Sequence, residues 1–444
     1  MKFSQERKRY FGTDGIRGVY GEDLTDGLAM LAGNSLGMSA KGGVVVIGRD
    51  TRPSGEELAR AIAEGALAAG GNVIDLGIAT TPCVAFVTRF IGASSGVMVS
   101  ASHNPPRYNG IKVFGGDGRK LSSAEEAVIE AHIADQKPNY APTRGSVLPS
   151  DGLKEAYISN ICGRIGRLDG LKVVLDCADG GGSETAPEVF ERLGADVRAL
   201  YCSREGAHIN EGRGALHPEV AAREVLRTGA SLGLSFDGDA DRVIACDENG
   251  ETVNGDGILF VLACTMKKRG SLPLSAAVGT LHTNLGAERA LAERGIALVR
   301  TDIGDHNVTR CMSENGYSLG GEQSGHIILG DFLPTGDGVY AGAALAAVML
   351  REERPLSSLA AYPVYPQRNA DIITARKREI ATDSSLLRYV AAVEGIMGEG
   401  GRVMLRPSGT EPKLRIMTES KDPFLADFAA RSIDLFIRTH YELQ

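Results

Sequence analysis

Blocks of apolar and polar residues follow one another in an order that occurs three times along the chain. The first copy has apolar runs at Val44–Ile47 and Val73–Leu76, separated by the polar turn Gly48–Arg52 and by apolar residues at helical spacing over Leu58–Leu67. This order is typical of a strand, a loop, a helix and a second strand. Gly70 follows the helix, where a left-handed residue commonly ends it.

The same order returns in two later segments, again with a glycine after the helix. Their first strands are expected at Lys172–Leu175 and Ser275–Val278, and their second strands at Val197–Leu200 and Ile296–Val299. Strands that alternate with helices favour parallel sheets. Because the unit is present in three copies, we expect three similar α/β domains.

Polar segments, two of which contain proline, mark the expected boundaries. Residues 136–150 form the expected first linker, and further joints lie near residues 248–257 and 362–366. From about residue 368 the order changes to strand, helix, strand, strand and helix, which predicts a small α+β domain. The expected domains are residues 1–150, 151–252, 253–366 and 367–444.

Composition limits the possible functions. Of 444 residues 43% are hydrophobic, and 48 basic against 56 acidic residues give a net charge of −8, so neither nucleic acid nor an acidic membrane is an expected partner. The basic start lacks the apolar stretch of a signal peptide, and no apolar run is long enough to span a membrane. Seven scattered cysteines without a Cys-x-x-Cys pair predict reduced thiols and a cytoplasmic protein.

One loop carries several reactive side chains directly after a predicted strand. The apolar run Gly96–Val99 is followed by Ser102, His103 and Asn104, and Lys112 lies ten positions after Ser102. A strand that ends in this way delivers a hydroxyl nucleophile and an imidazole onto a loop. The alternative is a polar turn whose Ser and Asn side chains only cap its own backbone.

Three carboxylates occupy alternate positions of a second loop. Asp237, Asp239 and Asp241 lie between a predicted strand and the apolar run Val243–Ala245. Hard divalent cations bind several oxygen ligands, and carboxylates supply both oxygen and charge. An EF-hand is excluded because Arg242 stands where that loop requires glycine. A solvated acidic turn is the alternative, but the buried strand that follows at once favours a metal site.

Two further loops are candidates for binding a sugar phosphate. In Gly321–His326 the side chains of Glu322 and Ser324 can contact sugar hydroxyls, while a glycine-rich hairpin is the alternative. In Arg406–Arg415 a Ser-Gly-Thr turn between two arginines can form an anion nest, and a polar hairpin is the alternative. The turns Phe11–Gly18 and Gly48–Arg52 add arginines that could bind an anion.

Several catalytic patterns are excluded. The chain has no Walker A lysine motif, no His-Glu-x-x-His and no dinucleotide-binding glycine fingerprint after a strand. Gly33, Ser35 and Gly37 match the Gly-x-Ser-x-Gly pattern of a nucleophile elbow. They lie within a stretch of helical spacing and not at a strand-to-helix turn, so this match is rejected.

With these motifs the chain resembles the α-D-phosphohexomutase family along essentially its whole length. The stretches that carry the resemblance are Phe11–Gly18, Ser100–Pro105, Asp237–Arg242, Gly321–His326 and Arg406–Pro412. The last four fall in four different expected domains. The resemblance therefore implies three similar α/β domains with mixed, mostly parallel sheets and a C-terminal α+β domain, arranged around one central cleft.

Within this family the chain is similar to the amino-sugar branch. The Phe-Gly-Thr-Asp-Gly start and Gln323 favour that branch over the phosphomannomutase/phosphoglucomutase branch. Tyr108, Pro407 and Lys413 depart from its frequent choices. The branch implies interconversion of an amino-sugar 6-phosphate and 1-phosphate through a bisphosphate, feeding the synthesis of nucleotide amino sugars and cell wall.

The resemblance also implies roles for individual residues. Ser102 carries a phosphoryl group and, with Asp237, Asp239 and Asp241, holds one Mg²⁺ per active site. Lys112 is the candidate general base, with a lowered pKa, and His326 or His103 assists it. A hexose bisphosphate serves as primer or activator. The residues expected to bind substrate are Arg17, His103, Arg242, Glu322, Ser324, Arg406, Ser408, Gly409, Thr410 and Arg415.

The implied partner is a small-molecule sugar phosphate, and a homodimer stays open as the assembly. Three other functions remain alternatives. A phosphomannomutase/phosphoglucomutase would share every motif. A metal-dependent sugar phosphatase would release free phosphate without forming an isomer, and a non-catalytic sugar-phosphate binder would show no turnover.

Overall fold

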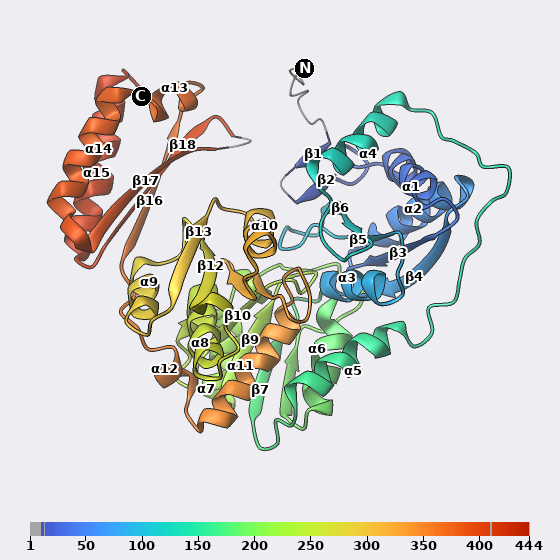
Figure 1. Cartoon of the computed structure of the whole chain (residues 1–444), viewed down its shortest axis with the longest axis horizontal. Coiled ribbons are helices and arrows are strands. Elements are labelled where there is room, and N and C mark those ends of the chain that lie inside the picture. Colours follow the sequence, from blue (N-terminus) through green and yellow to red (C-terminus); the bar gives the residue numbers. More distant parts are fainter. Residues whose placement is uncertain (1–9, 13, 409–410, 444) are drawn as a thin grey trace. The chain divides into compact units, whose positions relative to one another are not determined.

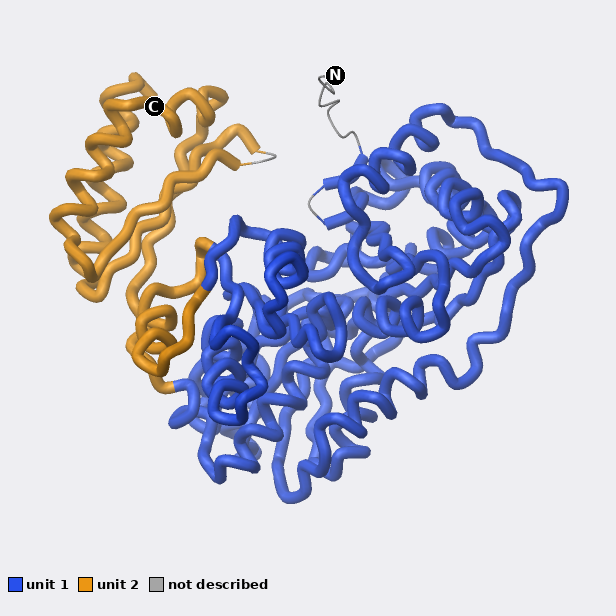
Figure 2. Tube along the Cα trace, viewed as in Figure 1, with its two compact units in different colours: residues 1–280, 299–360 blue, residues 281–298, 361–444 orange. Residues whose placement is uncertain are grey.

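The computed structural model describes residues 10–12, 14–408 and 411–443. The chain divides into two compact units (Figure 2). Unit 1 comprises residues 1–280 and 299–360, and unit 2 comprises residues 281–298 and 361–444.

The first sheet of unit 1 has six strands in the order β1-β2-β6-β5-β3-β4 (Figure 1). Strand β3 is parallel to β4 and β5, whereas β6 runs antiparallel to β5 and β2. Helix α2 packs on β3 and β4, and α3 packs on β3 and β5. The elements are β1 (Phe11–Gly12), β2 (Gly15–Val19), α1 (Asp26–Ala40), β3 (Val44–Arg49), α2 (Gly55–Ala68), β4 (Asn72–Ile78), α3 (Thr81–Phe90), β5 (Ser95–Val99), β6 (Tyr108–Gly115) and α4 (Ser123–Asp135).

The second sheet has five strands in the order β11-β10-β9-β7-β8. Strand β7 is parallel to β8 and β9, and β10 is antiparallel to β9. The hairpin between β9 and β10 carries the three aspartates. The elements are α5 (Leu153–Ile165), β7 (Lys172–Asp176), α6 (Gly182–Arg192), β8 (Asp196–Leu200), α7 (Glu219–Thr228), β9 (Leu232–Phe236), β10 (Val243–Cys246) and β11 (Thr252–Val253).

The third sheet has the order β13-β12-β14-β15, with β12 parallel to β14 and β15 antiparallel to it. Its elements are α8 (Gly255–Lys268), β12 (Ala276–Thr280), α9 (Leu285–Ala292), β13 (Ala297–Thr301), α10 (Asp305–Asn315), β14 (Leu319–Gly321), β15 (Ile327–Leu329), α11 (Gly338–Glu352) and α12 (Leu356–Leu359).

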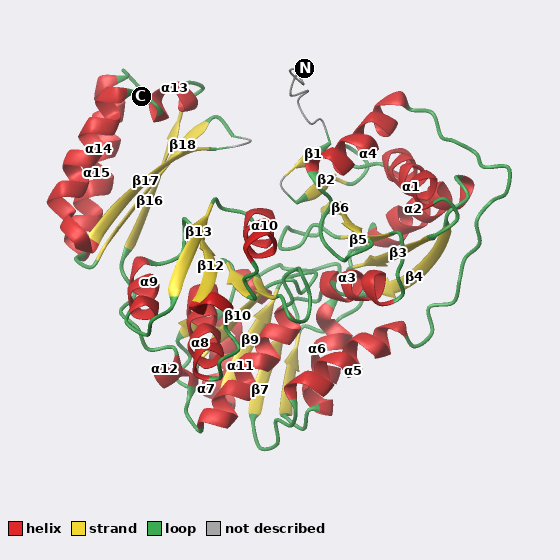
Figure 3. Cartoon of the chain, viewed as in Figure 1, coloured by secondary structure: helices red, strands yellow, loops and turns green. Residues whose placement is uncertain are grey.

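The fourth sheet, in unit 2, is antiparallel in the order β16-β18-β17, and helices α14 and α15 pack together against it (Figure 3). Its elements are β16 (Gln367–Ile373), α13 (Lys377–Ala381), α14 (Ser384–Met397), β17 (Gly401–Pro407), β18 (Lys413–Ser420) and α15 (Pro423–His440). This is the expected order of strand, helix, strand, strand and helix, with the short helix α13 added before α14.

The repeat predicted from the apolar pattern is confirmed by three matching segments, β3-α2-β4, β7-α6-β8 and β12-α9-β13. The glycines after the helices have left-handed backbones, with φ of +84° at Gly70, +92° at Gly194 and +68° at Gly295. The fold class is therefore confirmed: α/β sheets that mix parallel and antiparallel strands are followed by a C-terminal α+β part. Among the described residues, no helix is both long and apolar enough to cross a membrane.

The rejected elbow motif lies inside α1, where its glycines have a packing role. A Cβ atom would lie 2.0 Å from the Ile62 carbonyl oxygen if added at Gly33, and 2.3 Å from the Ala66 carbonyl oxygen if added at Gly37. Both carbonyls belong to α2. The glycines therefore let α1 and α2 approach more closely than any side chain would allow.

Candidate active site

Ser102 lies in the loop after β5 with its side chain against the acidic hairpin of the second sheet. It is 0% exposed, and its Oγ donates a hydrogen bond of 2.6 Å to Asp237 Oδ2. Its backbone is left-handed, with φ +53°, an uncommon conformation for a residue with a side chain. The Ser100 hydroxyl is occupied elsewhere, because it donates to Asp50 and accepts from the Ser102 amide. Ser102 is therefore the hydroxyl that faces the carboxylates.

The three aspartates of the β9–β10 hairpin form one buried cluster. Asp237, Asp239 and Asp241 are at most 2% exposed, and one oxygen of each lies within 4.8 Å of the others. Among the described residues, Asp239 Oδ1 is buried without a hydrogen-bond partner. Burial, followed by the charges of Asp241 and Asp239, raises the pKa of Asp237 well above its usual value. An oxygen-rich, strongly anionic and incompletely satisfied cluster fits a hard divalent cation.

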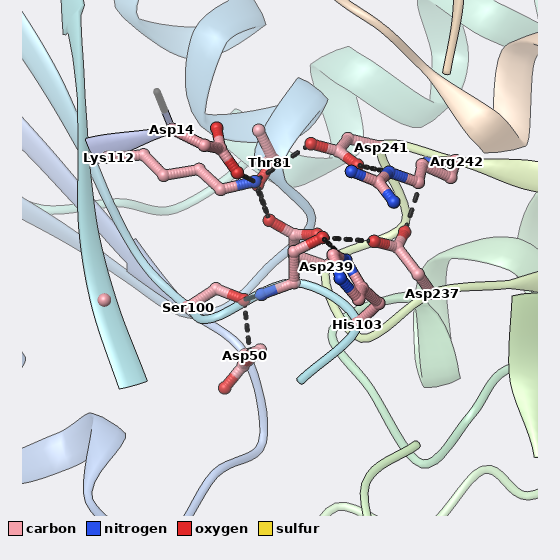
Figure 4. A network of polar contacts seen from close by, with 12 residues as sticks. Asp14, Asp50, Thr81, Ser100, His103, Lys112, Asp237, Asp239, Asp241 and Arg242 are labelled. Carbon is pink, nitrogen blue, oxygen red and sulfur yellow. Dashed lines mark hydrogen bonds and ion pairs between the residues drawn. The ribbon is translucent and has the colours of Figure 1, made fainter. Parts of the chain in front are cut away.

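Lys112 extends from β6 into this cluster (Figure 4). Its Nζ donates to Asp239 Oδ2 at 2.7 Å and to Asp241 Oδ2 at 2.9 Å, and it lies 3.5 Å from Asp14. Burial lowers the pKa of Lys112, but the three carboxylates outweigh burial and hold the pKa well above its usual value. The expectation of a lowered lysine pKa is therefore wrong, because three carboxylates from distant parts of the sequence surround the ammonium.

A second lysine, partly buried, completes the ion pairs and could not be predicted from the motifs. Lys120 forms short contacts with Asp14 and with Asp305, the first residue of α10. Asp14 also pairs with Arg17. Asp14 belongs to the Phe11–Gly18 motif, which could have indicated it, whereas no motif contains Lys120 or Asp305. Two lysines and four carboxylates (Asp14, Asp239, Asp241 and Asp305) thus form a continuous network from β6 to α10.

One histidine and two arginines also lie near Ser102. His103 Nδ1 lies 3.4 Å from Ser102 Oγ, and burial together with the charges of Arg242 and Arg17 lowers the pKa of His103 to about 4. His103 is therefore uncharged near neutral pH. The Arg242 amide donates to Asp237 Oδ1 at 3.1 Å. Two arginines beside an uncharged imidazole are suited to a dianionic phosphoryl group on Ser102.

The β14–β15 hairpin brings His326 to the acidic cluster. His326 is 2% exposed, its Nε2 accepts a hydrogen bond from the Gly336 amide, and its Nδ1 lies 3.7 Å from Asp241 Oδ1. Since Nε2 is an acceptor, the ring proton is on Nδ1 and faces Asp241. Glu322 accepts from the Gly304 amide, and Ser324 is exposed. His326 therefore lies beside a carboxylate of the acidic cluster and not beside the Ser102 hydroxyl.

The predicted phosphate loop belongs to unit 2, and Gly409 and Thr410 lie outside the described residues. Arg406 and Arg415 are direct partners across β17 and β18, so their side chains project from the same face of the hairpin. Ser408 is 5% exposed, and its Oγ accepts from the Glu411 amide. Burial and then the charges of Arg406, Arg402 and Arg415 lower the pKa of His282. This face of unit 2 carries Arg402, Arg406 and Arg415, of which Arg402 pairs with Glu419 and Arg415 with Glu411.

Comparisons with known proteins place the chain in a family. Models of the phosphoglucomutase/phosphomannomutase domains match in order along it: the α/β/α domains I, II and III match residues 8–140, 155–250 and 254–365, and the C-terminal domain matches residues 366–431. The phosphoglucosamine mutase of Symbiobacterium thermophilum is 44% identical over 98% of this chain and 100% of its own length. The phosphoglucosamine mutase of Macrococcus caseolyticus is 43% identical over 98% of this chain and 100% of its own length.

The chain belongs to the α-D-phosphohexomutase family. It is accordingly an enzyme, an isomerase of the mutase type. Among solved structures, a phosphoglucomutase/phosphomannomutase family protein of Burkholderia thailandensis superposes with a TM-score of 0.83 at 26% identity, over 96% of this chain and 97% of that one. An Aspergillus fumigatus N-acetylphosphoglucosamine mutase, in complex with GlcNAc-6P and magnesium, superposes with a TM-score of 0.69 at 16% identity, over 98% of this chain and 96% of that one. At this identity the likeness shows the fold alone.

The structure of this phosphohexomutase brings together the predicted Ser102, His103, Lys112, His326 and the three aspartates within unit 1. It adds Asp14, Lys120 and Asp305, which the motifs did not assign. Arg52, expected among the arginines that could bind an anion, instead donates to backbone carbonyls.

Proposed function

We propose that the chain is a phosphoglucosamine mutase, which interconverts glucosamine 6-phosphate and glucosamine 1-phosphate. One observation carries the proposal: Ser102 Oγ hydrogen-bonds to a buried triplet of aspartates. It occurs in a chain that is 44% identical along almost its full length to a phosphoglucosamine mutase. The amino-sugar preference rests on that identity and on the motif at the start of the chain.

In this scheme Ser102 carries the phosphoryl group. The phosphorus–oxygen bond to Ser102 breaks as the free hydroxyl of the bound sugar phosphate forms a new bond to phosphorus, which gives the 1,6-bisphosphate. The bisphosphate turns over and returns its other phosphoryl group to Ser102. A hexose bisphosphate primes the enzyme by phosphorylating Ser102 first. Such transfer depends mainly on positioning and on neutralisation of charge.

Asp237, Asp239 and Asp241 would hold Mg²⁺ together with an oxygen of the phosphorylated Ser102. When bound, the cation would neutralise charge between phosphate and carboxylates. The Lys112 ammonium supplies a second positive charge to the same cluster.

The sugar hydroxyl must lose a proton as it attacks. His103 lies close to Ser102 Oγ and is uncharged near neutral pH, so a ring nitrogen is free to accept that proton, but its pKa of about 4 makes it a weak base. Lys112 could act as the base only after its ammonium lost a proton to solvent, which three neighbouring carboxylates oppose. Of the two candidates, His103 is favoured by its protonation state.

Glu322 and Ser324 would contact the ring hydroxyls, and Arg17 and Arg242 the phosphoryl group in transfer. The face of unit 2 with Arg406, Ser408 and Arg415 would bind the phosphate that is not being transferred. Gly409 and Thr410 are proposed for the same phosphate from their motif alone. Such a second phosphate site distinguishes a mutase from a simple phosphatase.

The test is the turnover of glucosamine, glucose and mannose 6-phosphates side by side, with Mg²⁺ and a hexose bisphosphate primer. The proposal expects the highest kcat/KM for glucosamine 6-phosphate. A higher value for glucose or mannose 6-phosphate would instead identify a phosphomannomutase/phosphoglucomutase. Release of inorganic phosphate without an isomer would indicate a phosphatase, and binding without turnover a non-catalytic binder.

A further inference from the structure

Ser102 adopts a backbone conformation that its surroundings must impose. A non-glycine residue in the left-handed region is strained and persists only where other contacts hold it. At Ser102, with φ +53°, this conformation turns Oγ toward Asp237. Hydrogen bonds to the carbonyl oxygens of the same loop hold Ser102 in this conformation.

Arg52, from the turn after β3, binds four of these carbonyls. Its Nη2 donates to Ser102 O at 2.9 Å and to Asn104 O at 2.7 Å, and its Nη1 donates to Pro105 O at 2.6 Å and Tyr108 O at 2.8 Å. Its Nε donates to Asp50, so all five N–H groups of a guanidinium are engaged. With 1% exposure and no donor left, Arg52 cannot also bind a substrate phosphate.

Asp50 connects this arginine to the Ser102 amide. Besides Arg52, Asp50 accepts a hydrogen bond from Ser100 Oγ at 2.6 Å, and Ser100 Oγ in turn accepts from the Ser102 amide at 2.8 Å. Asp50 and Ser100 are both 0% exposed. The amide and the carbonyl of Ser102 are therefore held through one buried chain of hydrogen bonds.

Asn210 holds the same carbonyls from the part of the chain that carries the second sheet. Its side-chain Nδ2 donates to Ser102 O at 2.8 Å and to Asn104 O at 3.0 Å, and its backbone N–H donates to Ala178 O. The acidic hairpin packs against this point, because a Cβ at Gly238 would lie 2.5 Å from Ser102 O and 2.9 Å from Asn210 Nδ2. Asn210 thus links the Ser102 loop to the hairpin that carries the aspartates.

We propose that Arg52 and Asn210 are positioning residues that hold Ser102 in its left-handed conformation and so aim Oγ at the metal-site aspartates. Neither contacts the reacting atoms. The inference rests on the proposed role of Ser102 as phosphoryl carrier. A misplacement of about 1 Å in a reacting group can lower the rate about 100-fold. Loss of either residue therefore slows phosphoryl transfer to and from Ser102 and leaves substrate affinity almost unchanged.

The test uses the full-length protein with Asn210→Asp, which replaces a donor by an acceptor of the same shape, and Arg52→Lys, which keeps the charge but not the fork of donors. Asn249→Asp makes the same chemical change in the exposed turn between β10 and β11 and is the matched control. The time course of Ser102 phosphorylation by a hexose bisphosphate is followed by intact mass, alongside kcat, KM, Mn²⁺ affinity by calorimetry, and Tm.

We expect Asn210→Asp and Arg52→Lys to reach one phosphoryl group per chain, but about 10- to 100-fold more slowly than wild type. KM and Mn²⁺ affinity should stay within a few-fold of wild type, and Asn249→Asp should match wild type throughout. A merely structural role would lower the final stoichiometry at an unchanged rate, and that result would overturn the proposal. A wild-type rate of Ser102 phosphorylation in folded Asn210→Asp would also overturn the proposal. This variant alone decides the question if Arg52→Lys does not fold. If wild type itself takes up no phosphoryl group, that result contradicts the proposed role of Ser102 as phosphoryl carrier. It would not bear on Arg52 and Asn210 as residues that hold the Ser102 backbone.

Discussion

The residues around Ser102 include two lysines, each of which lies between carboxylates. Lys112 lies between Asp239 and Asp241, and Lys120 lies between Asp14 and Asp305. Removing one member of such a pair leaves a buried charge without compensation and costs about 3–5 kcal/mol. A bound cation can provide part of the missing charge, and this leads to a prediction about Lys112.

Lys112→Met should lower Tm markedly without added metal, because Asp239 and Asp241 lose their ammonium partner. Addition of Mg²⁺ should then raise the Tm of the variant more than that of wild type, since the cation would stabilise the two freed carboxylates. Thermal unfolding with and without Mg²⁺ measures both effects. Lys137→Met, at an exposed position, is the control and should unfold like wild type. An equal Mg²⁺ shift in Lys112→Met and wild type would count against a cation at these aspartates.

At the scale of residues, the sequence predicts the site residues that lie inside short motifs. Ser102 and the three aspartates could be predicted because their chemistry is visible in neighbouring residues. Arg52 and Asn210 could not be assigned in this way, because they act on the Ser102 carbonyl from 50 and 108 positions away. The pKa of Lys112 was predicted in the wrong direction for the same reason: its carboxylate neighbours lie 127 and 129 positions along the chain.

At the scale of elements, α11 begins at a buried acid. Asp337 Oδ1 accepts from the Tyr340 amide at 2.9 Å, and its Oδ2 accepts from the Tyr157 hydroxyl at 2.8 Å. Burial raises the pKa of Asp337 from 3.8 to about 7. The folded protein therefore binds a proton here that the unfolded chain releases at a lower pH. The stability that this proton provides is complete below pH 4 and is lost as the pH rises toward 7.

Asp337→Asn should remove this pH dependence, because the amide keeps the oxygen acceptor of the helix cap and carries no charge. Between pH 5.5 and 8.5 the free energy of unfolding of wild type should fall by about 2 kcal/mol relative to the variant. Denaturant unfolding at several pH values measures the difference. A difference that stays constant with pH would show that Asp337 is ionised in the folded protein throughout this range.

Helices α1 and α2 provide a second prediction at this scale. Gly33→Ala places a methyl group 2.0 Å from the Ile62 carbonyl, so the helices must separate, at a cost of about 1–3 kcal/mol. Gly27→Ala, in the same helix, meets only Thr25 Oγ1 at 3.9 Å and should stabilise by about 0.5–1 kcal/mol through helix propensity. Urea unfolding of both variants measures the contrast. Equal effects would mean that the close approach of α1 to α2 is not important for stability.

Much of the element pattern could be predicted, because it rests on local apolar periodicity and on glycines that must be left-handed. The strand order within each sheet could not, because it depends on contacts between distant segments. The expected domain limits at residues 150, 252 and 366 stay a prediction.

At the scale of the whole molecule, a chain with a net charge of −8 carries three arginines on one face of unit 2. If Arg406 binds the non-transferred phosphate, Arg406→Gln should raise KM about 10- to 100-fold, because a hydrogen bond to a charged group contributes about 1.5–3 kcal/mol. The stoichiometry of Ser102 phosphorylation by a large excess of primer should not change. Arg431→Gln, on the exposed surface of α15, is the control and should keep the wild-type KM. An unchanged KM in Arg406→Gln would remove this arginine from the substrate site.

The central claim is that Ser102 passes a phosphoryl group to and from the sugar phosphate. Intact mass and peptide mapping of wild type and Ser102→Ala, after incubation with a hexose bisphosphate and Mg²⁺, test it most directly. Wild type should gain one phosphoryl group on the peptide with Ser102 and lose it to added glucosamine 6-phosphate as bisphosphate forms, while Ser102→Ala gains none and is inactive. Full turnover by Ser102→Ala, or turnover by wild type that is never phosphorylated, would contradict the account.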